Sequence, residues 1–271
     1  MHFLSNLHTH SIYSDGADSP EAIVRAALGK GFRSIGFSDH SYLEGENWCM
    51  KYAAAGDYAA EIKKLAQKYS GQIEIYLGIE FDSSSDPVFY KDIAFDYKIA
   101  AVHEFRNERG QKWAVDDTAE IFAEATKSIG LEKAICGYYQ TMSDFIGSFK
   151  ADIIAHFDLV KKFNRGGRFF DEGADWYINA AFGALEKVQE SGAIIEVNTG
   201  GMARGYMDEP YPSEFILKRA LETGIPVTVG SDSHRKETLD FYFDGALEIL
   251  RSLGFGSVKM LLGGTFADVE I

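Results

Sequence analysis

The sequence has little cysteine, no long apolar run and no excess of positive charge. Its two cysteines, Cys49 and Cys136, are far apart and lack metal-type spacing, so we expect no disulfide framework and a reducing, cytoplasmic location. No basic segment followed by an apolar core opens the chain, and no stretch approaches the roughly 18 uninterrupted apolar residues of a membrane span. We therefore expect a protein without a membrane partner.

The formal net charge is −14, and clusters of Lys and Arg interleaved with aromatic residues are missing. Both features argue against long nucleic-acid partners, which bind by neutralisation of many phosphates. A small anionic substrate stays compatible with this composition if the site itself supplies positive charge. The nucleotide-binding motifs GxGxxG and GxxxxGK[ST] are also absent.

Short apolar segments rich in β-branched and aromatic residues alternate with helical periodicity, which is typical of βα units. With 271 residues, 46% of them hydrophobic, and no repeat or linker, we expect one domain over residues 1–271. Strands are predicted over 3–8, 33–38, 73–79, 97–102, 152–156, 193–198 and 226–230. Helices are predicted over 20–31, 58–69, 117–129, 131–149, 173–191, 213–223 and 240–253. Seven or eight such units favour a closed α/β barrel over the alternative, an open doubly wound sheet.

Histidines and acids recur where the predicted strands end. Six of the seven histidines lie there, and only His2, before the first strand, belongs to no pattern. The residues concerned are His8, His10, His40, Glu80, His103, His156, Asp232 and His234, with Asp15 in an Asp-Gly turn after the first strand. Because the carboxyl ends of barrel strands open on one face, we expect these side chains to converge there.

Imidazole and carboxylate together suit divalent transition metals, namely Zn, Fe or Mn. In extended chain, alternate side chains point the same way, so His8 and His10 can reach one ion, as can Asp232 and His234. Nine candidate ligands are too many for one ion and suit two or three, with Glu80 as the natural bridging carboxylate. Three divalent ions carry a charge of about +6, and the carboxylates of Asp15, Glu80 and Asp232 carry about −3. The remaining local charge of about +3 would attract a phosphate group.

The segments HTHSIYSDG, GFSDHS, GIEFD, AAVHEF, IIAHFDL, EVNTGG and GSDSHR resemble, in order and spacing, the motifs of the polymerase and histidinol phosphatase (PHP) superfamily. This resemblance implies a distorted (β/α)7 TIM-like barrel with a trinuclear metal site at the C-terminal mouth of the strands. By the family pattern, the first ion is held by His8, His10, Glu80 and Asp232, the second by Glu80, His103 and His156, and the third by Asp15, His40 and His234.

The length and the segment EPYPS at 209–213 most resemble the monofunctional histidinol-phosphate phosphatases of that superfamily, enzymes of histidine biosynthesis. The resemblance implies hydrolysis of L-histidinol phosphate by a hydroxide held between ions, with Glu80, Asp232 and His234 as catalytic residues. The relatives read Asn-Thr-Ser-Gly-Leu-Arg-Lys after the sixth strand, where this chain reads NTGGMARG from Asn198.

For the phosphate we expect contacts from Lys161 and Arg165, after His156, and from Arg204 on the next loop. The loop 41–52 contains aromatic and acidic residues and is either a lid or an irregular crossover packed on the barrel. Three other functions remain open: a PHP phosphoesterase for nucleotides, nucleic-acid ends or another small ester, a non-catalytic PHP module, and an amidohydrolase.

Overall fold

Seven parallel passes of the chain form the centre of the computed structural model, which describes residues 4–107 and 109–271. The strands are β1 (Leu4–Asn6), β2 (Phe32–Phe37), β3 (Glu74–Leu77) continued by β4 (Glu80–Asp82), β5 (Ile99–Ala101), β8 (Ile153–Ile154), β9 (Ile194–Asn198) and β10 (Val227–Gly230). Each predicted strand is present, and the third is split into β3 and β4. Phe3, the first residue of the first predicted strand, and His2, which precedes that strand, lie outside the described residues.

The strands form two parallel sheets, with the orders β1-β2-β3 and β10-β9-β8-β5-β4. Isolated parallel bridges join the sheets on both sides, between Thr9 and Ser233 and between His40 and Glu80. Backbone hydrogen bonds from the Ser233 N–H to the His8 carbonyl (3.1 Å) and from the Ser41 N–H to the Glu80 carbonyl (2.8 Å) lie beside these bridges. Strand pairing thus runs round the carboxyl ends but not along the full length of the strands, as in a distorted seven-stranded barrel.

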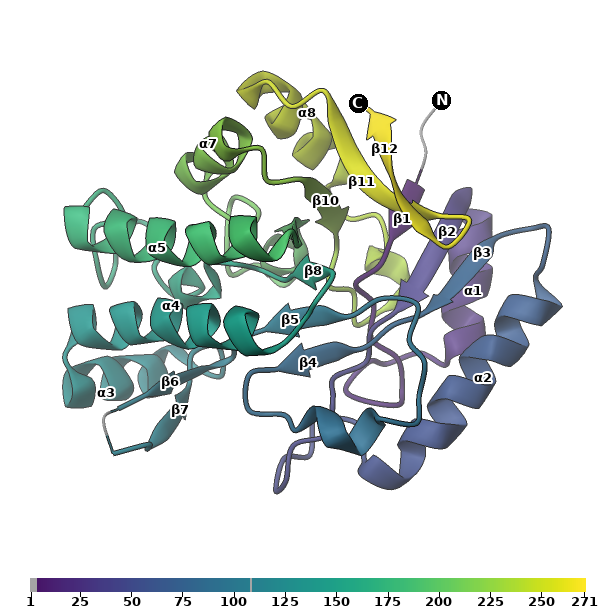
Figure 1. Cartoon of the computed structure of the whole chain (residues 1–271), viewed down its shortest axis with the longest axis horizontal. Helices are drawn as coiled ribbons and strands as arrows, with labels where there is room; N and C mark the ends of the chain where they lie inside the picture. The colour runs from purple at the N-terminus through teal and green to yellow at the C-terminus, as the bar shows by residue number, and fades with distance from the viewer. Residues whose placement is uncertain (1–3, 108) are drawn as a thin grey trace.

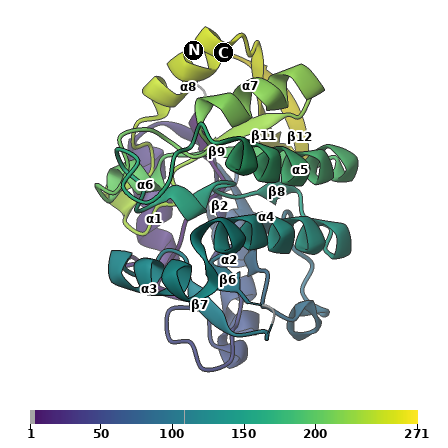
Figure 2. The ribbon, with the colours of Figure 1, turned by 90° about the vertical axis from the view of Figure 1, so that its left-hand side faces the viewer.

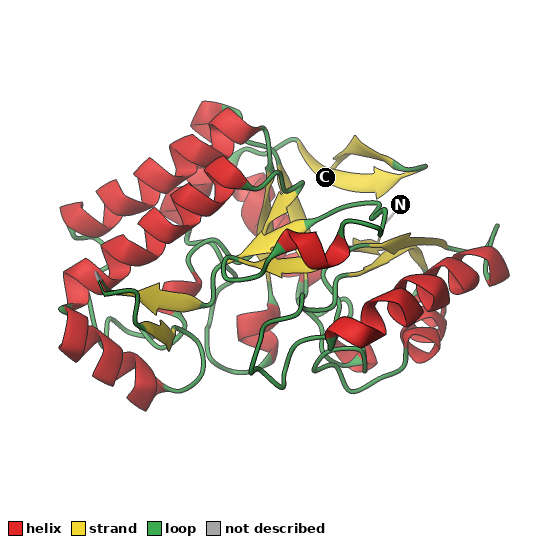
Figure 3. Cartoon of the chain, turned by 60° about the horizontal axis from the view of Figure 1, so that its bottom comes forward, coloured by secondary structure: helices red, strands yellow, loops and turns green. Residues whose placement is uncertain are grey.

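Helices cover the outside of the strands, in keeping with repeated βα units (Figures 1 and 3). They are α1 (Pro20–Gly29), α2 (Ala55–Lys68), α3 (Ala119–Ile129), α4 (Leu131–Ser148), α5 (Asp175–Ser191), α6 (Gly200–Ala203), α7 (Glu214–Thr223) and α8 (Phe243–Leu253). Ser19 caps α1 by accepting a hydrogen bond from the Ala22 N–H, and Pro20 is the first helical residue. In the described ranges, no helix is both long enough and apolar enough to cross a bilayer.

Two antiparallel hairpins were not predicted. The first pairs β6 (Glu104–Arg106) with β7 (Lys112–Ala114), beside α3 and α4 (Figure 2). The second pairs β11 (Ser257–Leu262) with β12 (Thr265–Glu270) at the C-terminus. Leu261 of β11 is buried in the same apolar cluster as Leu7, Ile99 and Ile153, and the Gly263 N–H donates to Glu74, at the start of β3. The C-terminal hairpin therefore covers the amino ends of the strands, opposite the predicted site.

The Tyr97 ring fills the barrel interior next to two glycines. Its hydroxyl donates a hydrogen bond to the Leu7 carbonyl. A Cβ atom added at Gly36 or Gly78 would overlap the Tyr97 side chain, so both positions need glycine for close packing rather than for a special backbone angle.

We expect Gly78→Ala to lower the free energy of unfolding by about 1–3 kcal/mol, because the ring has no room to retreat within the closed interior. Gly183→Ala is the matched control, since it lies within α5 with open space around it and should be stabilising by up to about 1 kcal/mol. Urea unfolding of both variants measures the difference. Equal stabilities of the two variants would contradict this account of the packing.

Candidate metal centre

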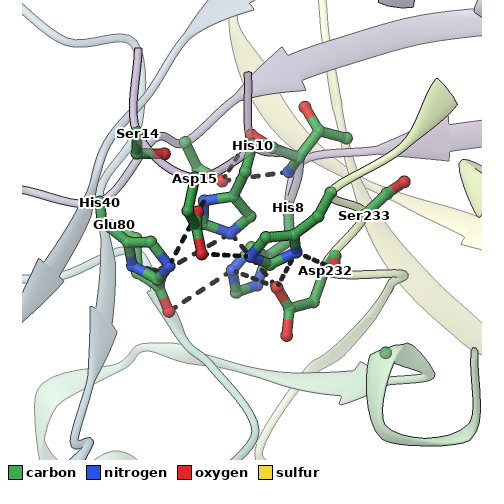
Figure 4. A network of polar contacts seen from close by, with 12 residues as sticks. His8, His10, Ser14, Asp15, His40, Glu80, Asp232 and Ser233 are labelled. Carbon is green, nitrogen blue, oxygen red and sulfur yellow. Dashed lines mark hydrogen bonds and ion pairs between the residues drawn. The ribbon is translucent and has the colours of Figure 1, made fainter. Parts of the chain in front are cut away.

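All nine predicted ligands lie in one cluster at the carboxyl ends of the strands. Figure 4 shows six of them, His8, His10, Asp15, His40, Glu80 and Asp232, with their side chains turned toward one another. His8 and His10 follow β1, His40 follows β2, Glu80 opens β4, His103 follows β5, His156 follows β8, and Asp232 and His234 follow β10. The convergence expected from strand-end positions is therefore what the fold produces.

Glu80 is at the centre of the cluster and is buried, with 1% of its surface exposed. Its Oε1 lies 3.1 Å from His156 Nε2, 3.4 Å from His8 Nε2 and 3.8 Å from His103 Nε2. Its Oε2 lies 2.7 Å from His40 Nδ1 and 3.7 Å from His10 Nε2. One carboxylate thus faces imidazoles from four strand ends, the arrangement required of a bridging ligand.

Two further carboxylates complete the cluster. Asp232 Oδ1 lies 3.2 Å from His10 Nε2 and 3.6 Å from His8 Nε2. Asp15 Oδ2 lies 3.1 Å from His234 Nε2, and Asp15 Oδ1 lies 3.7 Å from His40 Nε2. Potential ligand atoms fall into three groups with mutual distances within 4.8 Å: His8, His10 and Asp232; His8, Glu80 and His156; and His10, Asp15, His40 and His234.

Several buried atoms of the cluster have no hydrogen-bond partner among the described residues. They are Nε2 of His8, both ring nitrogens of His10, Nδ1 of His156 and Oε2 of Glu80, whose close contact with His40 is an ion pair without hydrogen-bond geometry. An unpaired buried polar atom is costly, and native proteins leave few of them. Nitrogen and carboxylate oxygen atoms that converge without partners are suited to divalent transition metals, so the cluster fits the metal chemistry that the sequence indicated.

Burial and charge act against each other in setting the protonation of the cluster. Burial opposes a charge on His8, but the carboxylates of Glu196, Glu80 and Asp232 outweigh it and raise the pKa of His8. Burial and the neighbouring His40 and His234 lower the pKa of His10 to about 3. Burial opposes ionisation of Glu80, yet the surrounding imidazoles hold its pKa well below the usual range. The carboxylates are therefore ionised and ready to bind a cation.

Two of the clustered residues have a left-handed backbone although neither is glycine. The φ angle is 24° at His156 and 46° at Asp232. Such angles are strained for side chains with a Cβ and occur mostly where function requires a particular placement. Each residue lies two positions beyond the end of a strand, and its side chain faces the cluster, with His156 against Glu80 and Asp232 against His10.

Outside the cluster, carboxylates bind the far nitrogens of two histidines. Asp82 Oδ2 lies 2.9 Å from His103 Nδ1, and Glu196 Oε1 lies 2.9 Å from His8 Nδ1. Such partners orient an imidazole and fix its tautomer for metal binding. Neither acid was predicted from the sequence, although Asp82 follows Glu80 by two positions and therefore shares its side of the extended chain. Glu196 is in β9, and Gly230 of β10 leaves the space that it occupies.

A cavity of about 950 Å³ opens above the cluster. Arg204 lines it, with Nη2 2.8 Å from Asp232 Oδ2. Lys161 and Arg165 do not line it. Lys161 is fully buried and donates hydrogen bonds to Glu209 and Ser213, and Arg165 forms an exposed ion pair with Asp208. The structure therefore brings only one of the three expected phosphate contacts to the cavity.

Lys162, the neighbour of Lys161, lines the cavity instead, and it donates a hydrogen bond to the Asp116 carbonyl. Part of the loop 41–52 also forms the wall, and Trp48 packs edge-on against His40 with 4.8 Å between ring centroids. The unpredicted hairpin of β6 and β7 contributes Glu104, Lys112 and Trp113 to the same wall. The loop is thus a cavity wall that packs on the site.

The chain is similar in sequence to known histidinol-phosphatases. The chain is 28% identical over 258 residues to the "Probable histidinol-phosphatase" of Deinococcus radiodurans, with 92% of this chain and 93% of that protein covered. It is 26% identical to the histidinol-phosphatase of Bacillus subtilis, with 90% and 97% covered.

A solved structure, histidinol phosphate phosphatase from Lactococcus lactis complexed with Zn, L-histidinol and phosphate, has the same fold. Its TM-score is 0.74 at 24% identity, and the match covers 97% of this chain and 98% of that one. The family model for the PHP domain matches residues 6–200. This range is more than half of the chain and includes seven of the nine candidate ligands, among them Asp15, so the chain belongs to the PHP domain family.

Proposed function

We propose that this protein is a metal-dependent phosphomonoesterase that hydrolyses L-histidinol phosphate to L-histidinol and phosphate. The observation that carries this proposal is the largely buried cluster of nine candidate ligands, with unpartnered buried atoms, at the base of a cavity of about 950 Å³. The names of the relatives support the choice of substrate. A place in histidine biosynthesis and a cytoplasmic location belong to the same proposal.

The cluster would hold two or three divalent ions, with Zn, Fe and Mn all suited to these donors. His8, His10 and Asp232 would bind one ion together with Glu80, and Glu80 would also face His103 and His156. Asp15, His40 and His234 would bind another. When bound, such ions supply positive charge for the phosphoryl group and acidify water near it. Glu80, Asp232 and His234 are the residues we propose as catalytic.

The cavity wall supplies further positive charge for the phosphate group. Burial disfavours the charged form of the Arg204 guanidinium, but the carboxylate of Asp232 outweighs this effect and raises the guanidinium's pKa. Arg204 therefore stays charged. Its Nη1 lies 3.2 Å from His234 Nδ1, which places it beside two of the three proposed catalytic residues, Asp232 and His234. Lys162 approaches from the loop after His156. Planar guanidinium groups bind phosphate oxygens in pairs, and this suits Arg204 for orientation of the ester.

The outer wall is suited to a cationic alcohol. Its acids are Glu44, Glu46, Glu104, Asp116 and Asp117, and its indoles are Trp48 and Trp113. L-Histidinol carries an amine and an imidazole, which carboxylates and aromatic faces bind well. Nucleotides carry additional negative charge or a neutral base, and this wall would not favour them.

A substrate panel tests the proposal. Protein loaded with Zn or Mn is expected to release phosphate from L-histidinol phosphate at least about 100-fold more efficiently than from nucleoside monophosphates, a difference of about 3 kcal/mol. Single-stranded oligonucleotides with a terminal phosphate complete the panel. Preference for a nucleotide or an oligonucleotide would contradict the proposed substrate but not the metal chemistry.

Arg204→Met is expected to lower kcat/KM for L-histidinol phosphate by about 10–100-fold, because a charged hydrogen bond to phosphate is lost. Arg165→Met is the matched control, since that side chain is exposed and paired with Asp208. We expect it to change kcat/KM less than about twofold. Steady-state kinetics measure both, and equal losses in the two variants would remove Arg204 from the substrate site.

A further inference from the structure

Asp39 is a fully buried residue whose carboxylate accepts hydrogen bonds from the turn over 11–14. Its Oδ1 accepts from the Ser11 N–H at 2.9 Å, the Ser14 N–H at 3.0 Å and the Ser14 hydroxyl at 2.7 Å. Its Oδ2 accepts from the Ser11 hydroxyl at 2.9 Å. Four donors of one short segment thus end on a single side chain. That segment directly precedes Asp15.

Asp39 and His40 are neighbours just beyond the end of β2. In extended chain, successive side chains point to opposite sides. His40 accordingly faces Glu80 in the cluster, while Asp39 faces the turn over 11–14. One strand end therefore provides a candidate ligand and, next to it, the anchor for the turn that carries another ligand.

The far side of the same turn is held as well. The Gly16 N–H donates to the Ser11 carbonyl at 3.0 Å, and the Ala17 N–H donates to the His234 carbonyl at 2.8 Å. A Cβ atom at Gly16 would overlap the His10 backbone, so the turn folds tightly back onto the β1 end. The backbone on one side of Asp15 is therefore bonded to Asp39, next to His40, and the backbone on the other side is bonded to the His234 carbonyl.

The Asp15 side chain itself is the least protected of the three clustered carboxylates. It is 33% exposed, compared with 1% for Glu80 and 8% for Asp232. It forms ion pairs with three imidazoles, those of His10, His40 and His234. The position of this carboxylate therefore depends on the backbone that carries it, and that backbone depends on Asp39.

We propose that Asp39 is a positioning residue that holds Asp15 in place for the cation of the Asp15, His40 and His234 group, and so determines how fully that site is occupied. The proposal rests on the proposed function in one respect only, namely that the cluster binds divalent ions. It assigns to Asp39 no contact with substrate or metal.

Metal content after dialysis against a weak chelator tests this role. Asp39→Ala is expected to lose about one equivalent of Mn or Zn per chain relative to the wild type, and Asp15→Ala the same equivalent. The double variant should lose no more than either single variant, because Asp39 acts through Asp15. Asp39→Asn should retain the metal, since an amide oxygen in place of Oδ1 still accepts from Ser11 and from both Ser14 donors.

Several outcomes would overturn the proposal. Full metal content in Asp39→Ala would show that Asp39 is not needed, and a further loss in the double variant would indicate a general structural role. If Asp39→Ala does not fold, Ser14→Ala decides, because it removes one donor from a partly exposed residue. It should weaken metal binding at this site about tenfold, and unchanged affinity would contradict the role of Asp39. Wild-type protein without any metal would instead contradict the proposed function.

Discussion

Glu80→Gln is expected to remove nearly all phosphatase activity, by about a thousandfold or more, which corresponds to about 4 kcal/mol. The reason is that the side chain is central to the cluster: its two oxygens lie within 4 Å of five imidazoles, those of His8, His10, His40, His103 and His156. Glutamine keeps the shape but loses the charge and the second acceptor oxygen. Metal content and phosphate release from L-histidinol phosphate are the measurements.

The control for Glu80→Gln is Glu190→Gln, the same change at an exposed residue paired with Lys187. It should leave metal content and activity as in the wild type. If Glu80→Gln kept full metal content and full activity while folded, the assignment of the bridging role would fail. A folded variant that kept its metal but lost activity would show that Glu80 is needed for catalysis and not for metal binding.

Removal of metal is the second change with a large expected effect. Ions that bind only the folded chain stabilise it by RT ln(1 + [L]/Kd), about 4 kcal/mol at a thousandfold excess over Kd. For a chain of this size we expect chelation to lower Tm by about 10 °C and to abolish phosphate release. Readdition of Zn or Mn should restore both. Thermal unfolding with and without chelator provides the measurement.

The pH dependence of this effect has a definite sign. Burial opposes protonation of His103, but its hydrogen bond with Asp82 and the charge of Glu80 raise its pKa to about 10. The carboxylates around His8 likewise outweigh burial and raise its pKa. A cation must displace these protons, so metal affinity, and the stabilisation it provides, should fall as the pH falls. Chelation that left Tm and activity unchanged at every pH would contradict a structural and catalytic role for metal.

The sequence predicted the barrel well because its strands are buried on both sides. Such strands are continuous apolar segments, and all seven are where the pattern placed them, with the third split at Gly78 and Ile79. The two hairpins were missed for different reasons. The strands β6 and β7 have three residues each, too few for a periodic pattern. The hairpin of β11 and β12 did have a signal in the sequence, the pair Gly263-Gly264, which is typical of a two-residue hairpin turn. Both glycines have positive φ in the structure, as such a turn requires.

The contacts around the site were harder to predict. Lys161 and Lys162 are adjacent on a short helical turn after β8, and only packing decides that Lys162 faces the cavity while Lys161 is buried against Glu209. The same holds for the supporting acids. In the sequence, Asp39 and Asp82 resemble ordinary strand-end acids, and Glu196 is a single acid within a strand. Their roles appear only when the partner histidine or turn lies within hydrogen-bond distance.

By itself, the sequence determined the architecture and the identity of the nine clustered residues. Strand ends of a parallel barrel meet on one face, so a ligand's place along its own strand suffices to predict that it joins the others. Only the tertiary structure decided which atoms face each other, which cations reach the cavity and which carboxylates support the histidines. Those features depend on distances between segments that are separated in the sequence, by as many as 188 residues for His8 and Glu196, and the chain encodes them through packing and not through any local pattern.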